Sequence, residues 1–197
     1  PIEPIKAYLH TQHEKFWLFH PERPFGQALS AAKGTEYSAA KLIGELSESS
    51  NKIRLFPPRT GKDKTEISYA EAARWLLYVN GYDDTSAKPK GKNLPSPGAG
   101  WLGKLGLITA KGKTLFETLM LNLVLLKEDY EPWEPNVPAW ELPKAREGER
   151  IEITIPDNPA ALLTLQSRRL LLERNNHKVT GYRLLGGDFF LQRKCLQ

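Results

Sequence analysis

The spacing of apolar residues predicts a well-defined helix near the middle of the chain. Over residues 68–80 the sequence SYAEAARWLLYVN repeats its apolar residues every three or four positions, as an amphipathic helix does. Ser68 and Glu71 have the spacing of a capping box, in which each side chain bonds to the backbone N–H of the other residue. Gly81 is placed to end the helix. If Trp75 is buried on this helix, its indole N–H needs a partner.

Three further segments carry helical patterns. The first covers residues 2–18, and a short second one covers residues 38–46. The third begins with another capping box, formed by Thr114 and Glu117, and continues to about residue 127 with leucines in register on one face. Each pattern predicts a helix that buries its apolar side.

Strand patterns appear only in the last third of the chain. RIEITI, residues 150–155, alternates like a half-buried strand. RRLLLERNNHKVTGYRLL, residues 168–185, predicts two strands that turn near Asn175 and Asn176, because asparagine tolerates the left-handed backbone of such a turn. We therefore predict an α+β fold: mixed helices, a small antiparallel sheet or hairpins in the second half, and long irregular loops.

The longest stretch without a clear pattern covers residues 85–113. It contains six lysines, six glycines, three prolines and no acidic residue. Loops of more than about 12–15 residues are uncommon in compact domains and are usually functional or disordered. Predicted helices on both sides fix its two ends, which argues against a simple linker. We expect the stretch to be mostly irregular and exposed, with Trp101 anchoring its return to the body.

Composition narrows the class of protein. The 197 residues carry a net charge of +5, and 40% of them are hydrophobic. This length suits about one domain with a real core, and the moderate positive charge is compatible with a nucleic-acid partner. Cys195 is the only cysteine, so no internal disulfide can form, which fits a reducing compartment such as the cytoplasm. No apolar run approaches the ~20 residues that span a bilayer.

Patterns for catalysis and metal binding are weak. His10 and His13 lie three residues apart, but no third ligand follows at a motif spacing, so we interpret them as surface or structural histidines. Asp83 and Asp84 follow a helix end and suit turn chemistry better than magnesium binding. The Walker A, G-x-G-x-x-G and G-x-S-x-G patterns are absent. No catalytic residue is therefore assigned.

A second basic loop, RLFPPRTGKDK, covers residues 54–64 and places Phe56 beside two prolines. Lysine and arginine on a glycine- and proline-rich backbone suit phosphate contact, because the charges give affinity that does not depend on sequence. Either loop alone could equally be a solvated surface loop. Two such loops on either side of the helix at residues 68–80 favour one shared surface.

Several short motifs, taken in order, resemble the large-subunit family (CasA) of the type I-E CRISPR Cascade complex. The motifs are FWLFHPERPFGQ, KLIGELS, AEAARWLLYVNGYDD, GKTLFETLMLNLVLL, VPAWE and LLTLQSRR. The resemblance covers about residues 16–187 and depends on the ordered set, since no single motif decides it. Members of the family are much longer. The resemblance therefore implies that residues 1–197 are the central part of a large N-terminal domain, without its first strands and without the C-terminal four-helix bundle.

The resemblance implies a non-enzymatic DNA-binding subunit. Such a subunit recognises the protospacer-adjacent motif in duplex DNA, promotes target binding and R-loop formation, and helps to recruit the helicase–nuclease. A guide RNA reads the rest of the target by base pairing. The implied partners are the double-stranded DNA target, the guide RNA ribonucleoprotein with the other Cascade subunits, and the helicase–nuclease. No membrane and no cofactor are implied, and this chain lacks the cysteines for a zinc site. We expect the isolated fragment to be monomeric.

The resemblance also assigns two groups of residues. The phenylalanine that begins the family's docking loop, which faces the guide end of the complex, corresponds to Phe56. The residues that follow it include Arg59, Lys62 and Lys64. The groove-reading loop corresponds to Lys88, Lys90, Gly91, Lys92 and Asn93. Because this loop has fewer glycines than the family pattern, it implies more phosphate contact and less readout by the backbone.

Two functions of other classes remain open at this stage. One is a nucleic-acid-processing enzyme whose active site lies outside these residues, and DNA processing that is lost in EDTA would indicate it. The other is an interaction domain without a nucleic-acid role, which would not retain DNA even at about 50 mM salt.

Overall fold

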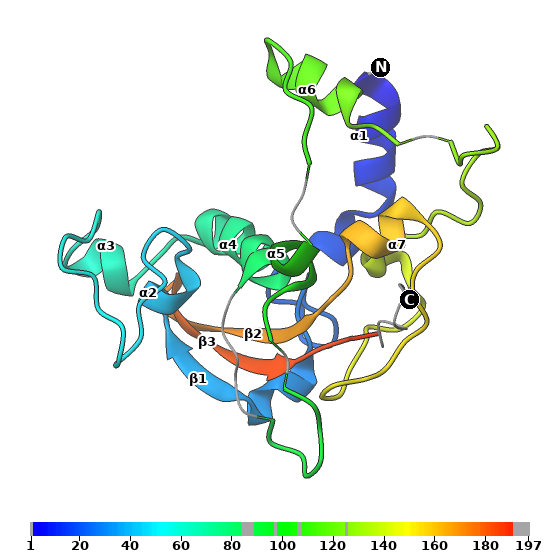
Figure 1. Cartoon of the computed structure of the whole chain (residues 1–197). Coiled ribbons are helices and arrows are strands. Elements are labelled where there is room, and N and C mark those ends of the chain that lie inside the picture. The colour runs from blue at the N-terminus through cyan, green and yellow to red at the C-terminus, as the bar shows by residue number, and fades with distance from the viewer. Residues whose placement is uncertain (1, 84–88, 97, 106–107, 125, 191–197) are drawn as a thin grey trace.

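A three-stranded antiparallel sheet with helices on one face forms the body of the chain (Figure 1). The computed structural model describes residues 2–83, 89–96, 98–105, 108–124 and 126–190. The strands are β1 (Thr35–Ser38), β2 (Arg168–Asn175) and β3 (Lys178–Gly186), in the order β1-β3-β2. The predicted α+β fold is confirmed, although the edge strand β1 comes from the first half of the chain and was not predicted.

The core lies between the sheet and the helices α2 (Ala39–Leu42) and α4 (Tyr69–Tyr82). Burial of each large apolar side chain contributes roughly 1.5–3 kcal/mol. The sheet contributes Leu170, Leu172, Val179, Tyr182 and Leu184, and the helical side contributes Leu42, Ile43, Leu46, Ile67, Ala72, Leu76 and Val79. The predicted burial of Leu42, Ile43 and Leu46 is confirmed, although α2 itself ends at Leu42.

Helix α4 begins where its capping signal predicts. The Ser68 hydroxyl accepts a hydrogen bond from the Glu71 backbone N–H at 3.2 Å. The Glu71 carboxylate is used elsewhere: it accepts from the indole N–H of Trp75 at 3.2 Å and from the Arg59 guanidinium. Trp75 therefore has the partner that its burial requires.

The β2–β3 hairpin turns through Asn176 and His177, whose φ angles are 45° and 63°. Two consecutive residues with positive φ are typical of a type I′ turn, which matches the twist of the strands beside it. The predicted hairpin is confirmed, with its turn one residue further along the chain. Residues 150–155 do not form the predicted strand. In the described part of the chain their backbone bonds to Gly186, the last residue of β3, and to Phe189 beyond it, for example from Arg150 N to the Gly186 carbonyl oxygen at 2.9 Å.

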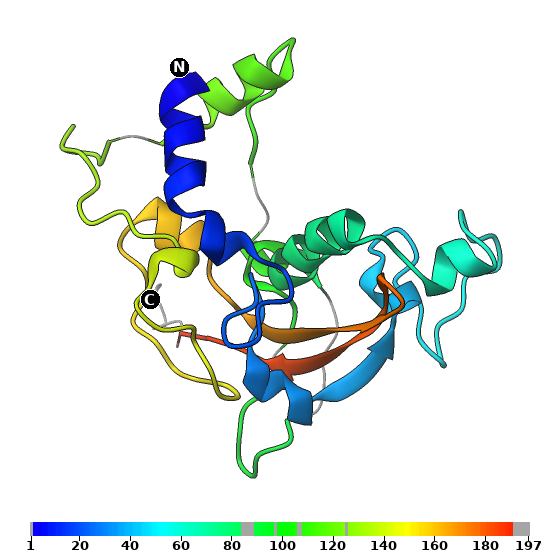
Figure 2. The same ribbon diagram turned by 180° about the vertical axis from the view of Figure 1, so that it is seen from behind.

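Two predicted helices are shorter than expected. The first consists of α1 (Ile2–Thr11) and the 3-10 turn η1 (His13–Phe16), and the second is α6 (Leu115–Leu121). In Figures 1 and 2, α1 and α6 extend away from the sheet and its helices. The predicted burial of the α6 leucines is wrong, since Leu115 is 76% and Leu119 is 56% exposed. The spacing of the leucines predicts which face of the helix is apolar, whereas burial of that face depends on whether another element packs against it.

The remaining elements are short. They are η2 (Leu29–Lys33), α3 (Lys62–Thr65), α5 (Trp101–Leu105), η3 (Ala139–Glu141) and α7 (Pro159–Leu163). Within the described ranges, the helices are too short or too polar to cross a bilayer.

Candidate nucleic-acid interface

The lysine-rich stretch at residues 85–113 is divided in two by α5, so it is not the single irregular loop that we predicted. Residues 89–96, the basic arm, project beside the sheet, and residues 108–113 lead in the opposite direction towards α6 (Figures 1 and 2). The lysines of the stretch therefore do not share one surface. Lys90 and Lys92 belong to the basic arm, and Lys111 and Lys113 to the other part.

Close backbone packing holds α5 against the end of α4. The Gly100 N–H donates to the Asp83 carbonyl oxygen at 2.8 Å. A Cβ atom on Gly100 would lie 2.3 Å from the Gly81 carbonyl oxygen, so only glycine permits this approach. Gly81 lies within α4 and serves this packing, which corrects its predicted role as the helix terminator. Trp101 and Leu102 line a cavity of about 330 Å³ against the body, in agreement with the predicted anchoring by Trp101.

A buried arginine joins the two residues that bracket the basic arm. Arg168 on β2 is 1% exposed, and its Nη2 donates to the Asp83 carbonyl oxygen at 3.2 Å and to the Gly98 carbonyl oxygen. Its Nε also lies 3.7 Å from the Asp83 carboxylate, which in turn lies 3.7 Å from Lys41 Nζ. The chain therefore leaves the body at Asp83 and returns to it at Gly98, and the Arg168 guanidinium holds both positions together. Asp83 has a structural role here, and Asp84 lies outside the described residues.

A second set of contacts holds the basic arm near its middle. The Glu149 carboxylate accepts hydrogen bonds from Lys90 N, at 2.9 and 3.1 Å, and from Gly91 N, at 2.9 Å. Arg150 Nε donates to the Pro95 carbonyl oxygen at 3.0 Å. No signal in the sequence indicated these contacts, because the partners lie 55–59 residues apart and form no known motif.

Four of the five predicted groove-reading residues lie on the surface of the basic arm. Lys90, Gly91, Lys92 and Asn93 are exposed, whereas Lys88 lies outside the described residues. Asn93 has a φ of 61°, a left-handed conformation that asparagine tolerates. A Cβ atom on Gly91 would lie 2.6 Å from Leu94 Cδ1, so glycine leaves room for the Leu94 side chain to fold back over the arm.

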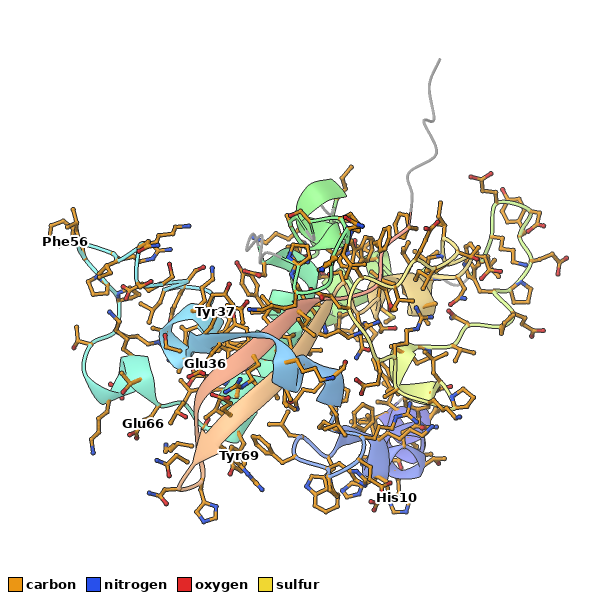
Figure 3. All side chains as sticks on the ribbon, turned by 90° about the horizontal axis from the view of Figure 1, so that it is seen from below. His10, Glu36, Tyr37, Phe56, Glu66 and Tyr69 are labelled. Atoms are coloured by element: carbon orange, nitrogen blue, oxygen red, sulfur yellow. The ribbon has the colours of Figure 1, made fainter. Side chains whose placement is uncertain are left out.

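The second basic loop, at residues 54–64, lies at another end of the molecule (Figures 1 and 2). The two loops do not form the shared surface that we predicted. Phe56 is 94% exposed, and Figure 3 shows its side chain at the outer edge of the molecule. Leu55 beside it is 90% exposed. The loop therefore presents apolar side chains to solvent at its tip.

The predicted cations of this loop differ in their surroundings. Arg59 is bound by two carboxylates, and the hydrogen bond to Glu71 is the main cause that raises its pKa. Lys64 forms an ion pair with the buried carboxylate of Glu48. These two residues hold the base of the loop on the body. Lys62, at the start of α3, is exposed.

The histidines lie on the surface. His10 and His13 are exposed, and His13 Nδ1 lies 3.6 Å from the neighbouring Glu14 carboxylate. Among the residues that the structure describes, no three His, Cys, Asp or Glu side chains converge as metal ligands. Cys195 lies outside those residues.

The sequence is similar to that of known CRISPR-associated proteins. The model of the family described as CRISPR-associated protein Cse1 matches residues 1–193. A relative from Thermus thermophilus, described as CRISPR-associated protein CasA/Cse1, is 34% identical over 162 residues. That match covers 76% of this chain and 28% of the relative.

Solved structures agree with this similarity. Cse1 of Thermobifida fusca superposes with a TM-score of 0.71 at 28% identity, over 95% of this chain and 36% of that chain. Cse1 of Acidimicrobium ferrooxidans gives a TM-score of 0.67 at 30% identity, again over 95% and 36%. A chain from a structure described as a CRISPR RNA-guided surveillance complex has the same fold, with a TM-score of 0.66 and 24% identity over 98% of this chain and 39% of that chain. The chain thus spans well under half the length of these relatives.

Proposed function

Because the chain belongs to the Cse1 (CasA) family of CRISPR-associated proteins, we propose that it is part of the large subunit of a type I-E RNA-guided surveillance complex. In this role it recognises the protospacer-adjacent motif in duplex DNA, promotes R-loop formation and helps to recruit the helicase–nuclease. It acts in the cytoplasm without catalytic chemistry of its own. Its partners are the DNA target, the guide RNA ribonucleoprotein and the other Cascade subunits. Residues 1–197 correspond to the central part of the large N-terminal domain.

The observation that carries this proposal is the basic arm. Lys90 and Lys92 are exposed on a projecting segment between Asp83 and Gly98, whose carbonyl oxygens both accept from the buried Arg168. Lysine charges attract phosphates whatever the sequence, and a restrained backbone can be presented to a groove at a fixed place. Minor-groove readout mainly separates A·T from G·C pairs, so it suits an arm of this small size.

The loop at residues 54–64 is proposed as the docking loop towards the guide end of the complex. Its exposed tip residues, Leu55 and Phe56, are available to a partner, and burial of such side chains contributes strongly to protein interfaces. Lys62 is exposed and can contact a partner's phosphates, while Arg59 and Lys64 act through the fixed shape of the loop base.

The test of DNA recognition is a charge deletion in the basic arm. Lys88, Lys90 and Lys92 are replaced together by alanine in the full-length subunit within the complete complex, and binding to motif-bearing and scrambled duplexes is measured across a salt series. Each neutralised phosphate contributes ~0.9 to the slope of log K against log salt. If all three lysines contact phosphates, the slope should flatten by about 2–3.

A charge-matched control is available in the same chain. Replacement of the exposed Lys111, Lys113 and Lys178 by alanine should leave the slope closer to that of the wild type, because these residues lie away from the basic arm. Equal slopes for both triple variants and the wild type would show that the arm is only a solvated face.

Gly91→Val tests readout separately from charge. A valine side chain would displace the Leu94 side chain, and it would obstruct a close approach of the arm's backbone to a DNA groove. Discrimination between motif and scrambled duplex should then fall more than non-specific affinity. Full discrimination in this variant would mean that the arm does not read the motif.

A further inference from the structure

We propose that Glu149 is a positioning residue for motif recognition: its carboxylate fixes the backbone of the basic arm and thereby determines how well the arm distinguishes motif from non-motif duplex. This inference rests on the function proposed above. It is argued from the contacts of residues 147–150, the clasp, which has the sequence Glu-Gly-Glu-Arg.

The first half of the clasp is bonded to the body. The Glu147 carboxylate accepts from Leu29 N at 2.9 Å and from Ser30 N at 2.7 Å, at the start of η2. Gly148 N donates to Ser30 Oγ at 3.0 Å, and the Gly148 carbonyl oxygen accepts from Arg169 Nε at 3.1 Å. Arg169 is almost fully buried on β2, so the backbone just before Glu149 is held by the core of the sheet.

The second half of the clasp is held as firmly. Arg150 N donates to the Gly186 carbonyl oxygen at 2.9 Å, where β3 ends. The Arg150 guanidinium lies 4.1 Å from the ring centroid of Phe189, a distance at which a cation is attracted by the ring. Because its backbone is fixed on both sides, Glu149 presents its carboxylate at one place relative to the sheet.

The carboxylate of Glu149 bonds to two consecutive amides of the basic arm, those of Lys90 and Gly91. Hydrogen bonds with a charged acceptor are stronger than those between neutral groups. These bonds fix the two peptide groups on either side of Lys90, and Arg150 fixes the arm again at Pro95. An arm restrained before it binds loses less conformational entropy when DNA orders it.

Glu149 also affects DNA binding through its charge, and this effect opposes the gain from a restrained arm. It places a negative charge beside lysines that are proposed to contact phosphates, and that charge weakens non-specific attraction to DNA. Removal of the carboxylate should therefore separate two quantities. Non-specific affinity should stay equal or rise, whereas discrimination should fall. A general loss of folding would lower both.

The experiment compares Glu149→Ala and Glu149→Gln in the complete complex, with motif-bearing and scrambled duplexes. Both variants lose the charge, but glutamine keeps one oxygen that can accept from the arm. Loss of about one to two hydrogen bonds to a charged group predicts about a tenfold fall in discrimination for alanine and a smaller fall for glutamine. The matched control is Glu152→Ala, which removes the same charge three residues away at an exposed position outside the clasp, so it should keep discrimination.

Hydrogen exchange on the same full-length proteins measures directly whether the clasp protects the amides of the arm. The Lys90 and Gly91 amides should exchange slowly in the wild type and faster in Glu149→Ala. The inference is overturned if the wild-type complex discriminates and Glu149→Ala discriminates equally well, or if Glu149→Ala and Glu152→Ala lower discrimination alike. A wild-type complex that does not discriminate at all refutes the proposed function itself, which is a separate result.

Discussion

Arg168→Met is expected to destabilise the chain severely, although it replaces one long side chain by another. Arg168 is 1% exposed and donates to the carbonyl oxygens of Ser167 and Asp83, both at 3.2 Å, and of Gly98. Methionine fills much of the same space but offers no donor to these acceptors, and it removes a cation that lies 3.7 Å from the buried Asp83 carboxylate. Removal of one partner from a buried ion pair costs about 3–5 kcal/mol.

Urea unfolding of the chain, followed by circular dichroism, measures this loss. For a chain of this length, 1 kcal/mol corresponds to about 2–4 °C in melting temperature, so a thermal melt should fall by roughly 6–20 °C. Arg183→Met, on the neighbouring strand, is the control. Arg183 is 35% exposed and pairs with Glu173 at 2.6 Å and Glu36 at 3.1 Å, and pairs of this exposure contribute about 1 kcal/mol or less. If both variants lose the same stability, or if Arg168→Met loses less than about 1 kcal/mol, the buried network does not hold the arm as argued.

Two further predictions concern the other loop. Phe56→Ala should change the stability of the chain by less than about 0.5 kcal/mol in a thermal melt, because its ring is exposed, but it should weaken assembly of the complete complex. The control is Phe19→Ala, which removes a ring packed on Tyr69 and should clearly destabilise the chain in the same melt. A large loss of stability in both variants would contradict the docking role of Phe56. Burial acts to raise the pKa of Glu71, but hydrogen bonds from Arg59 and Trp75 outweigh it and hold that pKa below its usual value of 4.5. A lowered carboxyl pKa stabilises the fold above the usual value of 4.5, and this stability is lost as the pH falls through the lowered pKa. Glu71→Gln should therefore be less stable than the wild type at pH 7, and the difference should shrink as the pH falls below 4.5. A difference of constant size in urea unfolding would refute the linkage.

Local sequence signals predicted the elements whose stability depends on local contacts. The Ser68 cap, the two asparagines at the hairpin turn and the leucines after Ser38 each act within a few residues of themselves, so the local sequence pattern predicts these elements. The start of α6 follows the same rule, because Thr114 accepts from the Glu117 N–H as its spacing predicts.

The features that the sequence did not reveal all depend on contacts between distant segments. Residues 150–155 alternate like a strand, yet β3 ends too early to pair with them along their length. Gly81 looks like a helix terminator, but its lack of a side chain leaves room for Leu102 of α5, whose Cδ1 would lie 2.9 Å from a Cβ atom on Gly81. The candidate site shows the same limit: the lysines of the basic arm were identified from composition, whereas Glu149 could be identified only once its distance to the arm was known.

The attachment of the basic arm has a consequence for the changes that this chain can accommodate. At its base the arm is fixed through the carbonyl oxygens of Asp83 and Gly98, groups that every amino acid supplies, and through the N–H of Gly100, where only glycine fits. The residues between these points can therefore change in identity and number while the anchor stays the same. Loop-closure entropy penalises such insertions only weakly, by ~0.6 kcal/mol for each doubling of length. A segment mounted in this way is exchangeable: under the proposed role in DNA recognition, its sequence can change while the scaffold that carries it stays the same.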